Sequence, residues 1–410
     1  MRITVVEQNG TGGLAHYAYQ MCTALANEGH DVTLITAKLY ELENFPHNFK
    51  VDRRLDLWDL FDRRVETLPR NAIHSLLRTI FWQSRRAFRA LKLINAWIGL
   101  TRFLEKDRPD IVQFGKMNFP FEAFFLAHMK RSGLILTEIC HEFERRESTG
   151  IFARYIDRLY RGIFTHYTAI FFHAKQNRDR FLTLFPEIPP ERAHLIHHGN
   201  EGMFLSLAAN QVPVDLRSRY GLKTDEPVVL FFGLLAPSKG LPVLIRAMEA
   251  VCREEQVKLL IAGYPAKNMD LGELYDLVEA CGLKDSVIFD VRYIPISEVS
   301  PLMDLACMVV LPYLSSTQSG SLQVAYSFGR PVIASRVGGL TEAVEDGKNG
   351  FLVPVNDAGA LAEKITLLLR DPRLRERMGQ YNKEQSETRY SWKSVAETIT
   401  RVYLGIRQSG

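Results

Sequence analysis

The sequence lacks several features that would place it in a specialised class of proteins. Its five cysteines include no Cys-x-x-Cys pair, which favours reduced, buried side chains rather than a disulfide framework. The longest apolar run, Val228–Ala236, falls far short of the roughly 20 residues that a membrane span requires. The chain opens directly on a strand-like segment, Arg2–Val6, so we expect no signal peptide. Together these absences predict a cytoplasmic protein.

Patterns that would mark a metal site or a nucleic-acid surface are also missing. No Asp-x-Asp pair occurs, and no His or Cys residues have the spacing of metal ligands. The formal net charge is only +4, from 51 basic and 47 acidic side chains, without a nucleic-acid-binding motif. We therefore expect neither a bound metal nor a nucleic-acid partner.

What is present is a regular alternation of short β-branched runs with longer amphipathic stretches, which predicts parallel sheets with crossover helices. A chain of 410 residues suits two Rossmann-like units. We predict one unit over 1–205 and a second over 215–388, joined by a polar linker at about 206–226, with a last helix at about 391–410 crossing back onto the first unit. Strands are expected near residues 3–6, 32–36, 111–114, 134–139, 169–172 and 195–197, and then near 228–233, 258–262, 287–290, 308–311, 332–334 and 351–353.

A glycine-rich loop, Asn9–Gly13, follows the first predicted strand and precedes a helical pattern. Free amides at a helix start favour an anion, so Gly12 and Gly13 are expected to contact phosphate. The spacing Gly10-x-Gly12-x-x-Ala15 also fits a degenerate dinucleotide fingerprint, but the second strand ends without the acid that binds a ribose. A nucleotide-cofactor oxidoreductase and a tight turn without a ligand stay open as alternatives.

The second half carries two longer motifs. Phe231–Gly240 has the sequence FFGLLAPSKG, and Gly329–Pro354 has the sequence GRPVIASRVGGLTEAVEDGKNGFLVP. They resemble the signature segments of the family-four retaining glycosyltransferases, or glycosyl transferases group 1. The resemblance extends over essentially the whole chain, including the glycine loop, the Ile196–Gly199 turn and the final helix. It implies a GT-B fold, with an acceptor-binding and a nucleotide-sugar-binding Rossmann-like domain facing across a cleft.

Lys239 comes just past a predicted strand end, where open α/β sheets bind ligands and an ammonium neutralises a diphosphate. The resemblance implies this catalytic, donor-binding role, and an exposed lysine without function is the alternative. Leu234 stands where the family usually has a second cation, and Arg292 is a candidate to replace it. Arg292 and Tyr293 are also expected near the nucleotide base.

The family's paired glutamates are missing from this chain. No carboxylate occurs between Asp304 and Glu342, and Val324 stands at the position of the second glutamate. The segment Ser319, Gly320, Ser321 and Leu322 still opens a helix, so its amides are predicted to hold sugar or phosphate. Ribose recognition then passes to Gln323 or Glu342. Loss of both acids also leaves open a catalytically impaired protein that binds a membrane or a partner.

His141 directly follows the predicted strand 134–139. The resemblance implies that it approaches the donor sugar as a catalytic residue, and a structural histidine is the alternative. It also implies a retaining reaction without metal or cofactor. The substrates would be a UDP- or GDP-hexose and a glycan or lipid-linked acceptor, in cell-envelope polysaccharide biosynthesis.

A basic amphipathic stretch at 73–104 places Arg78, Arg85, Arg89 and Lys92 on one helical face. This pattern favours peripheral contact with anionic headgroups on the inner face of the membrane, or with a lipid-linked diphosphate. A helix packed on the sheet with a solvated basic face is the alternative.

Overall fold

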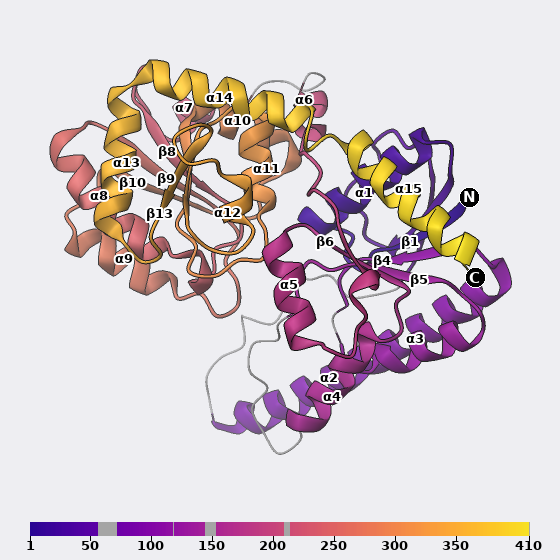
Figure 1. Cartoon of the computed structure of the whole chain (residues 1–410). Coiled ribbons are helices and arrows are strands. Elements are labelled where there is room, and N and C mark those ends of the chain that lie inside the picture. Colours follow the sequence, from indigo (N-terminus) through magenta and orange to yellow (C-terminus); the bar gives the residue numbers. More distant parts are fainter. Residues whose placement is uncertain (56–71, 118, 144–152, 209–213, 410) are drawn as a thin grey trace. The chain divides into compact units, whose positions relative to one another are not determined.

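The computed structural model describes residues 1–55, 72–117, 119–143, 153–208 and 214–409, without the side chains of 72–87, 153–158 and 409. The chain divides into two compact units. The first comprises Met1–Phe172, Arg180–Leu195 and Ala396–Gly410, and the second comprises His173–Asp179 and Ile196–Val395. Each unit is built on one parallel sheet, with helices between most consecutive strands (Figure 1). The predicted α/β class with two Rossmann-like domains is confirmed.

The first unit contains a seven-stranded sheet in the order β3-β2-β1-β4-β5-β6-β7. Strands β4, β5 and β6 are buried along their whole length, as expected of parallel strands covered on both faces. The strands are β1 (Arg2–Val6), β2 (Asp31–Ala37), β3 (Lys50–Leu55), β4 (Ile111–Phe114), β5 (Leu136–Ile139), β6 (Ala169–Phe172) and β7 (Ala193–Leu195). The helices are α1 (Gly13–Asn27), α2 (Ala72–Asp107), α3 (Glu122–Arg131) and α4 (Ala153–Phe164). Helix α5 (Lys175–Leu184) is shared, because its residues up to Asp179 cluster with the second unit and those from Arg180 onward with the first.

Strand β3 was not expected from the sequence, although the other six strands of this sheet were. Its sequence, KVDRRL, alternates charged and apolar residues and has little of the β-branched signal that marks the other strands. It is an edge strand that pairs with β2. Charged side chains are common on edge strands because they discourage pairing with other chains.

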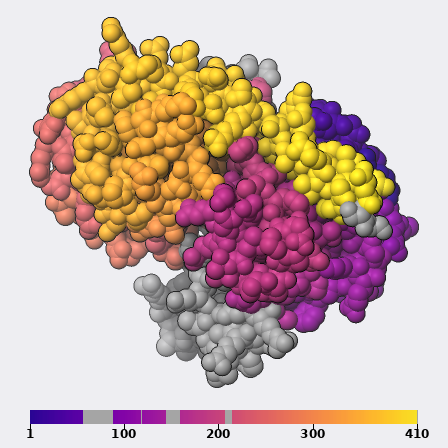
Figure 2. All heavy atoms as spheres, in the orientation of Figure 1, coloured from indigo at the N-terminus to yellow at the C-terminus, as the bar shows by residue number. Residues whose placement is uncertain are grey.

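The C-terminal helix α15 (Trp392–Ser409) packs on the first unit through its residues from 396 onward. The buried Tyr403 hydroxyl donates to Gln113 Oε1 at 2.6 Å, and His30 Nε2 lies 2.8 Å from Thr400 Oγ1. Figure 2 shows this helix in yellow on the surface of that unit. These contacts make the end of the chain part of the first unit.

The second unit contains a six-stranded sheet in the order β10-β9-β8-β11-β12-β13, and all six strands agree with the prediction. They are β8 (Val228–Phe232), β9 (Lys258–Gly263), β10 (Val287–Val291), β11 (Ala306–Leu311), β12 (Val332–Ser335) and β13 (Gly350–Val353). The helices are α6 (Met203–Ala208), α7 (Leu216–Arg219), α8 (Leu241–Glu254), α9 (Leu271–Ala280), α10 (Ile296–Leu305), α11 (Gly320–Ser327), α12 (Leu340–Ala343), α13 (Ala358–Arg370) and α14 (Pro372–Glu387).

The segment predicted as a linker at 206–226 is partly structured. Leu216 is buried, and the Asp215 carboxylate caps α7 by accepting from the Ser218 amide at 3.1 Å. Residues 196–205, assigned to the first unit from the sequence, cluster with the second. Hydrogen bonds explain this, because the Asn200 amide donates to Tyr390 O and the Glu201 amide to Ser327 Oγ.

Candidate functional site

The loop that follows β8 is held rigidly at the carboxyl end of the second sheet. Its last turn, Pro237–Lys239, is a 3-10 turn that ends at Gly240, whose φ is +68°. A Cβ at Gly240 would lie 1.9 Å from Pro312 O, so only glycine fits there. The Leu314 amide donates to Ser238 O at 2.8 Å, which joins this loop to the segment after β11.

The side chain of Lys239 lies over an aromatic ring. Its Nζ is 3.6 Å from the centroid of the Tyr313 ring, a cation–π geometry. Tyr313 is buried, and its hydroxyl is hydrogen-bonded to Ser319 Oγ at 3.1 Å. The ammonium is therefore held beside the loop that leads into α11.

The N-terminus of α11 also lies beside Tyr313 and Lys239. Ser319 caps this helix, because its Oγ accepts from the Leu322 amide at 3.3 Å. Ser321 faces the loop after β8, since a Cβ built on Gly233 would lie 2.7 Å from Ser321 Oγ. The structure thus brings Lys239 together with the predicted segment Ser319, Gly320, Ser321 and Leu322. A cation beside a helix N-terminus is an arrangement that suits a phosphate group.

Val324, at the position of the missing second glutamate, and its neighbour Gln323 are buried in α11. Gln323 and Val324 are 3% and 4% exposed. Gln323 Oε1 has no hydrogen-bond partner among the described residues. A buried acceptor without a partner costs free energy, which a ligand hydroxyl would recover.

Glu342, the other candidate for ribose recognition, caps a helix. Its carboxylate accepts from the Lys175 amide at 2.8 Å and from the Gln176 amide at 2.7 Å, at the start of α5. A carboxylate is stabilised there by the helix dipole and the free amides. The carboxylate is therefore already engaged by the protein.

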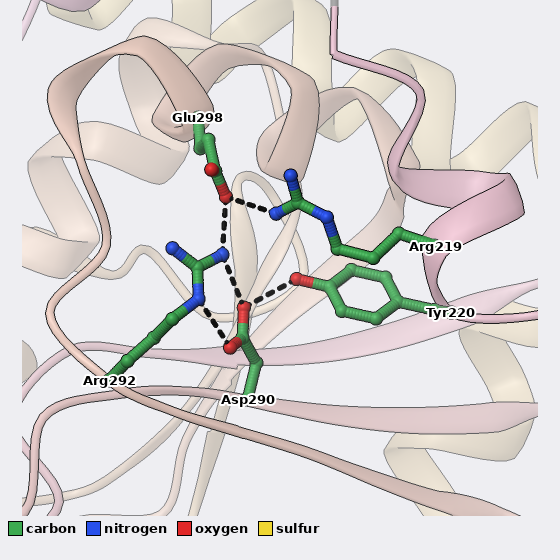
Figure 3. A network of polar contacts seen from close by, with 5 residues as sticks. All are labelled: Arg219, Tyr220, Asp290, Arg292 and Glu298. Atoms are coloured by element: carbon green, nitrogen blue, oxygen red, sulfur yellow. Dashed lines mark hydrogen bonds and ion pairs between the residues drawn. The ribbon is translucent and has the colours of Figure 1, made fainter.

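Arg292 belongs to a polar network at the end of β10, shown in Figure 3. Its Nε and Nη2 donate to the two oxygens of Asp290 at 2.7 and 2.9 Å, and Nη2 also donates to Glu298. Arg219 Nη1 donates to Glu298 at 2.6 Å, and the Tyr220 hydroxyl donates to Asp290 at 2.6 Å.

The charges of this network balance, with two guanidinium groups and two carboxylates. Burial raises the pKa of Glu298, but hydrogen bonds from Arg292 and Arg219 outweigh burial and leave that pKa lowered. The geometry therefore ties α7, β10 and α10 together. Tyr293 follows Arg292 directly and is half-buried.

In the first unit, the glycine loop contacts a carboxylate of the protein itself. The Gly12 amide donates to Glu41 Oε1, and His16 Nε2 lies 2.6 Å from the same oxygen. Gly12 has φ +78°, and α1 begins at Gly13. A negative charge thus already occupies the amide that was predicted to meet a phosphate.

His141 follows β5 and is largely buried, at 9% exposed. Its ring meets the Tyr17 ring edge-on, with centroids 5.0 Å apart. Both side chains line a small cavity together with Glu7, which directly follows β1. Burial raises the pKa of the Glu7 carboxyl to about 7, although hydrogen bonds from Asn9 and the charge of Lys116 lower it.

Sequence reasoning missed three residues of these sites: Glu7, Glu41 and Tyr313. All three follow closely on the carboxyl end of a strand, where parallel sheets place ligand contacts. Their position after a strand end was the signal by which the sequence could have identified them as site residues. Their partners His141, His16 and Lys239 are distant in sequence or lie on other elements, so the pairings were not visible.

Helix α2 carries exposed apolar side chains in its described part. Phe88, Leu91 and Ile94 are 67%, 62% and 38% exposed. The side chains of Arg78 and Arg85, predicted on its basic face, lie outside the described residues. None of the described helices is both long and apolar enough to cross a membrane. Within the described chain, no three His, Cys, Asp or Glu residues gather as they would around a metal ion.

The chain has two Rossmann-like units, and the second has a cation beside a helix N-terminus at the edge of its sheet. This combination is typical of GT-B proteins. Residues 11–200 match the family model described as Glycosyltransferase Family 4, and residues 215–385 match the model described as Glycosyl transferases group 1. The chain belongs to this family of glycosyltransferases.

Curated relatives match about half of the chain. Alpha-D-kanosaminyltransferase of Streptomyces kanamyceticus is 29% identical over 54% of this chain and 56% of its own length. D-inositol 3-phosphate glycosyltransferase of Corynebacterium glutamicum is 30% identical over 52% of each chain. The matched region spans about half the length of these relatives.

Solved structures match over the whole chain. Sucrose-phosphate synthase from Thermosynechococcus elongatus has a TM-score of 0.71 at 21% identity and covers 100% of both chains. Anabaena HepE in complex with UDP has a TM-score of 0.71 at 17% identity and covers 99% of this chain and 100% of its own. At these identities the likeness shows the fold, which is GT-B.

Proposed function

We propose that this protein is a glycosyltransferase that moves a hexose from a nucleotide-diphosphate sugar to a glycan or a lipid-linked glycan. The observation that carries the proposal is the group formed by Lys239, Tyr313, Ser319 and the start of α11. It offers one ammonium and several amides at the edge where open sheets bind nucleotides. The family membership supports the same activity.

In this proposal the diphosphate lies against the Lys239 ammonium and the amides of Gly320 and Ser321, because the Leu322 amide already donates to Ser319 Oγ. Tyr313 positions the ammonium, because a cation over an aromatic face gains about 0.5–2 kcal/mol. The cation stabilises the negative charge that grows on the leaving diphosphate as the glycosidic bond breaks. Arg292 is already paired with two carboxylates, so we assign it to stabilising the fold at the end of β10 and not to binding the diphosphate.

Recognition of the nucleoside falls to the residues around α11 and β10. The buried Gln323 Oε1, without a partner among the described side chains and backbone, is suited to accept from a ribose hydroxyl. Tyr293, after β10, provides an aromatic face for the base. Similar structures support a uridine donor, since Anabaena HepE was solved in complex with UDP and with UDP-glucose.

We assign His141 to the reacting sugar, where it hydrogen-bonds a hydroxyl or stabilises the positive charge at the anomeric carbon. The family implies retention, without a metal. The bond from the anomeric carbon to the diphosphate breaks, and the acceptor oxygen bonds to the same face. The acceptor proton passes to the departing phosphate oxygen, so atoms and charges balance.

The acceptor side includes helix α2. Its exposed Phe88 and Leu91 lie three residues apart, with Lys92 beside them, on a segment without any acid between Thr79 and Thr101. We propose that this face touches anionic headgroups, which would bring the enzyme to lipid-linked acceptors at the inner membrane face. A related structure, WaaG, is described as acting in lipopolysaccharide biosynthesis, which supports an envelope role.

The test is nucleotide binding measured by calorimetry with UDP and with GDP. Lys239→Gln should weaken binding about tenfold or more, because a charge-assisted contact contributes roughly 1.5–3 kcal/mol. Lys284→Gln, an exposed lysine of the same unit, is the matched control and should bind normally. Arg292→Gln should retain affinity but lower the melting temperature, and an affinity loss equal to that of Lys239→Gln would return Arg292 to the diphosphate.

Three outcomes separate the candidate functions. Binding of UDP or GDP with sugar release from the matching donor supports the transferase. Binding without any turnover across a panel of donors and glycan acceptors supports the catalytically impaired protein that lost its paired glutamates. A thermal shift with NAD or NADP, but with neither UDP nor GDP, would overturn the proposal in favour of an oxidoreductase.

A further inference from the structure

A small cavity at the carboxyl end of the first sheet contains polar groups from three elements. Glu7 reaches it from the end of β1, Tyr17 from α1, and His141 from the end of β5. The remaining lining is mostly apolar, and the cavity measures about 10 Å³. That volume is close to the minimum for one water molecule, which would need polar partners to stay.

The Glu7 carboxyl is fixed in its orientation. Its Oε1 accepts from the Asn9 amide at 2.8 Å and from Asn9 Nδ2 at 2.7 Å. Its Oε2 lies against Gly115, where a Cβ would come within 2.2 Å of it. Gly115 lines the same cavity, so glycine at this position leaves room for the carboxyl. The side chain is 2% exposed.

Such a carboxyl changes its hydrogen-bonding role close to neutral pH. Burial raises the pKa of Glu7 to about 7 against the lowering effects of Asn9 and Lys116. The charge of Lys116, after β4, acts on Glu7, and Lys116 pairs with Glu142, which follows His141 directly. The protonated carboxyl donates, and the ionised carboxyl only accepts.

We propose that Glu7 is a positioning residue for His141, orienting its imidazole through one water molecule in the cavity that they share. Which ring nitrogen carries the proton is set by the partner of the other nitrogen. The carboxyl therefore determines which nitrogen His141 presents to a substrate. The inference rests on the proposed role of His141 in sugar transfer, but its test does not require transfer.

The test is a pH titration of the histidines labelled with carbon-13 at Cε1, followed by NMR in the full chain. A His141→Asn variant identifies the His141 signal among the 11 histidines. In the wild-type protein, the chemical shift of this signal should show an inflection near the pKa of Glu7. Glu7→Gln should remove that inflection and leave the other histidine signals in place.

Glu142→Gln is the matched control, because it removes one carboxylate directly beside His141 without touching the cavity. It should keep the inflection near the pKa of Glu7. A wild-type curve without that inflection, or a Glu7→Gln curve that retains it, would overturn the proposal. The wild-type curve alone decides the matter if Glu7→Gln does not fold. UDP affinity should stay within twofold in Glu7→Gln, so a failed nucleotide site is recognised separately.

Discussion

The buried imidazole of His198 makes the second unit sensitive to acid. Burial lowers its pKa from the usual 6.5 to about 4, although Nδ1–H donates to Gly199 O at 2.8 Å and raises it. In the unfolded chain the His198 imidazole binds a proton as the pH falls below 6.5, whereas in the folded chain it does so only near pH 4. Stability is therefore present above pH 6.5 and is lost as the pH falls towards 4.

The size of this loss follows from the two pKa values. Their separation corresponds to about 3 kcal/mol in full, and to about 2.5 kcal/mol at a pH of about 4.5. His198→Gln removes the titration. We expect the wild-type free energy of unfolding to fall, between about pH 7 and about pH 4.5, by about 2.5 kcal/mol more than that of the variant.

Urea denaturation followed by far-ultraviolet circular dichroism measures this difference at both pH values. His128→Gln is the control, because that side chain is 56% exposed and lies in the first unit. It should follow the wild-type protein. Equal losses in the wild-type protein and in His198→Gln would refute the assignment of the acid sensitivity to this imidazole.

Two further predictions concern a glycine and a surface. Gly240→Ala should destabilise the second unit by about 2–4 kcal/mol, because the new Cβ meets Pro312 O, while Gly282→Ala, with φ +67° and open space, should lose about 1 kcal/mol in thermal denaturation. Replacing Phe88 and Leu91 together by serine should reduce sedimentation with phosphatidylglycerol vesicles several-fold; unchanged sedimentation, or equal binding to neutral vesicles, would remove α2 as the lipid contact.

The second sheet could be predicted in full from the sequence because its strands are mostly apolar, such as Val228–Phe232, which lies between a proline and a glycine. Such runs have few alternatives to a buried strand in an α/β fold. Strand β3 could not be predicted, because its charged residues suit a loop equally well and only pairing with β2 makes it a strand. Local pattern therefore determines central strands better than edge strands.

The sequence by itself determined the family, since family membership depends on short contiguous motifs, and it predicted a phosphate contact for the loop around Lys239. The tertiary structure decided which charges are available. Arg292 was a candidate for the second cation, yet folding places Asp290 and Glu298 around it. Glu7 and His141 are separated by most of the first unit's sequence and meet only at the ends of parallel strands. The charge and the pKa of a side chain depend on its neighbours in space, and a linear motif does not show which residues those neighbours are.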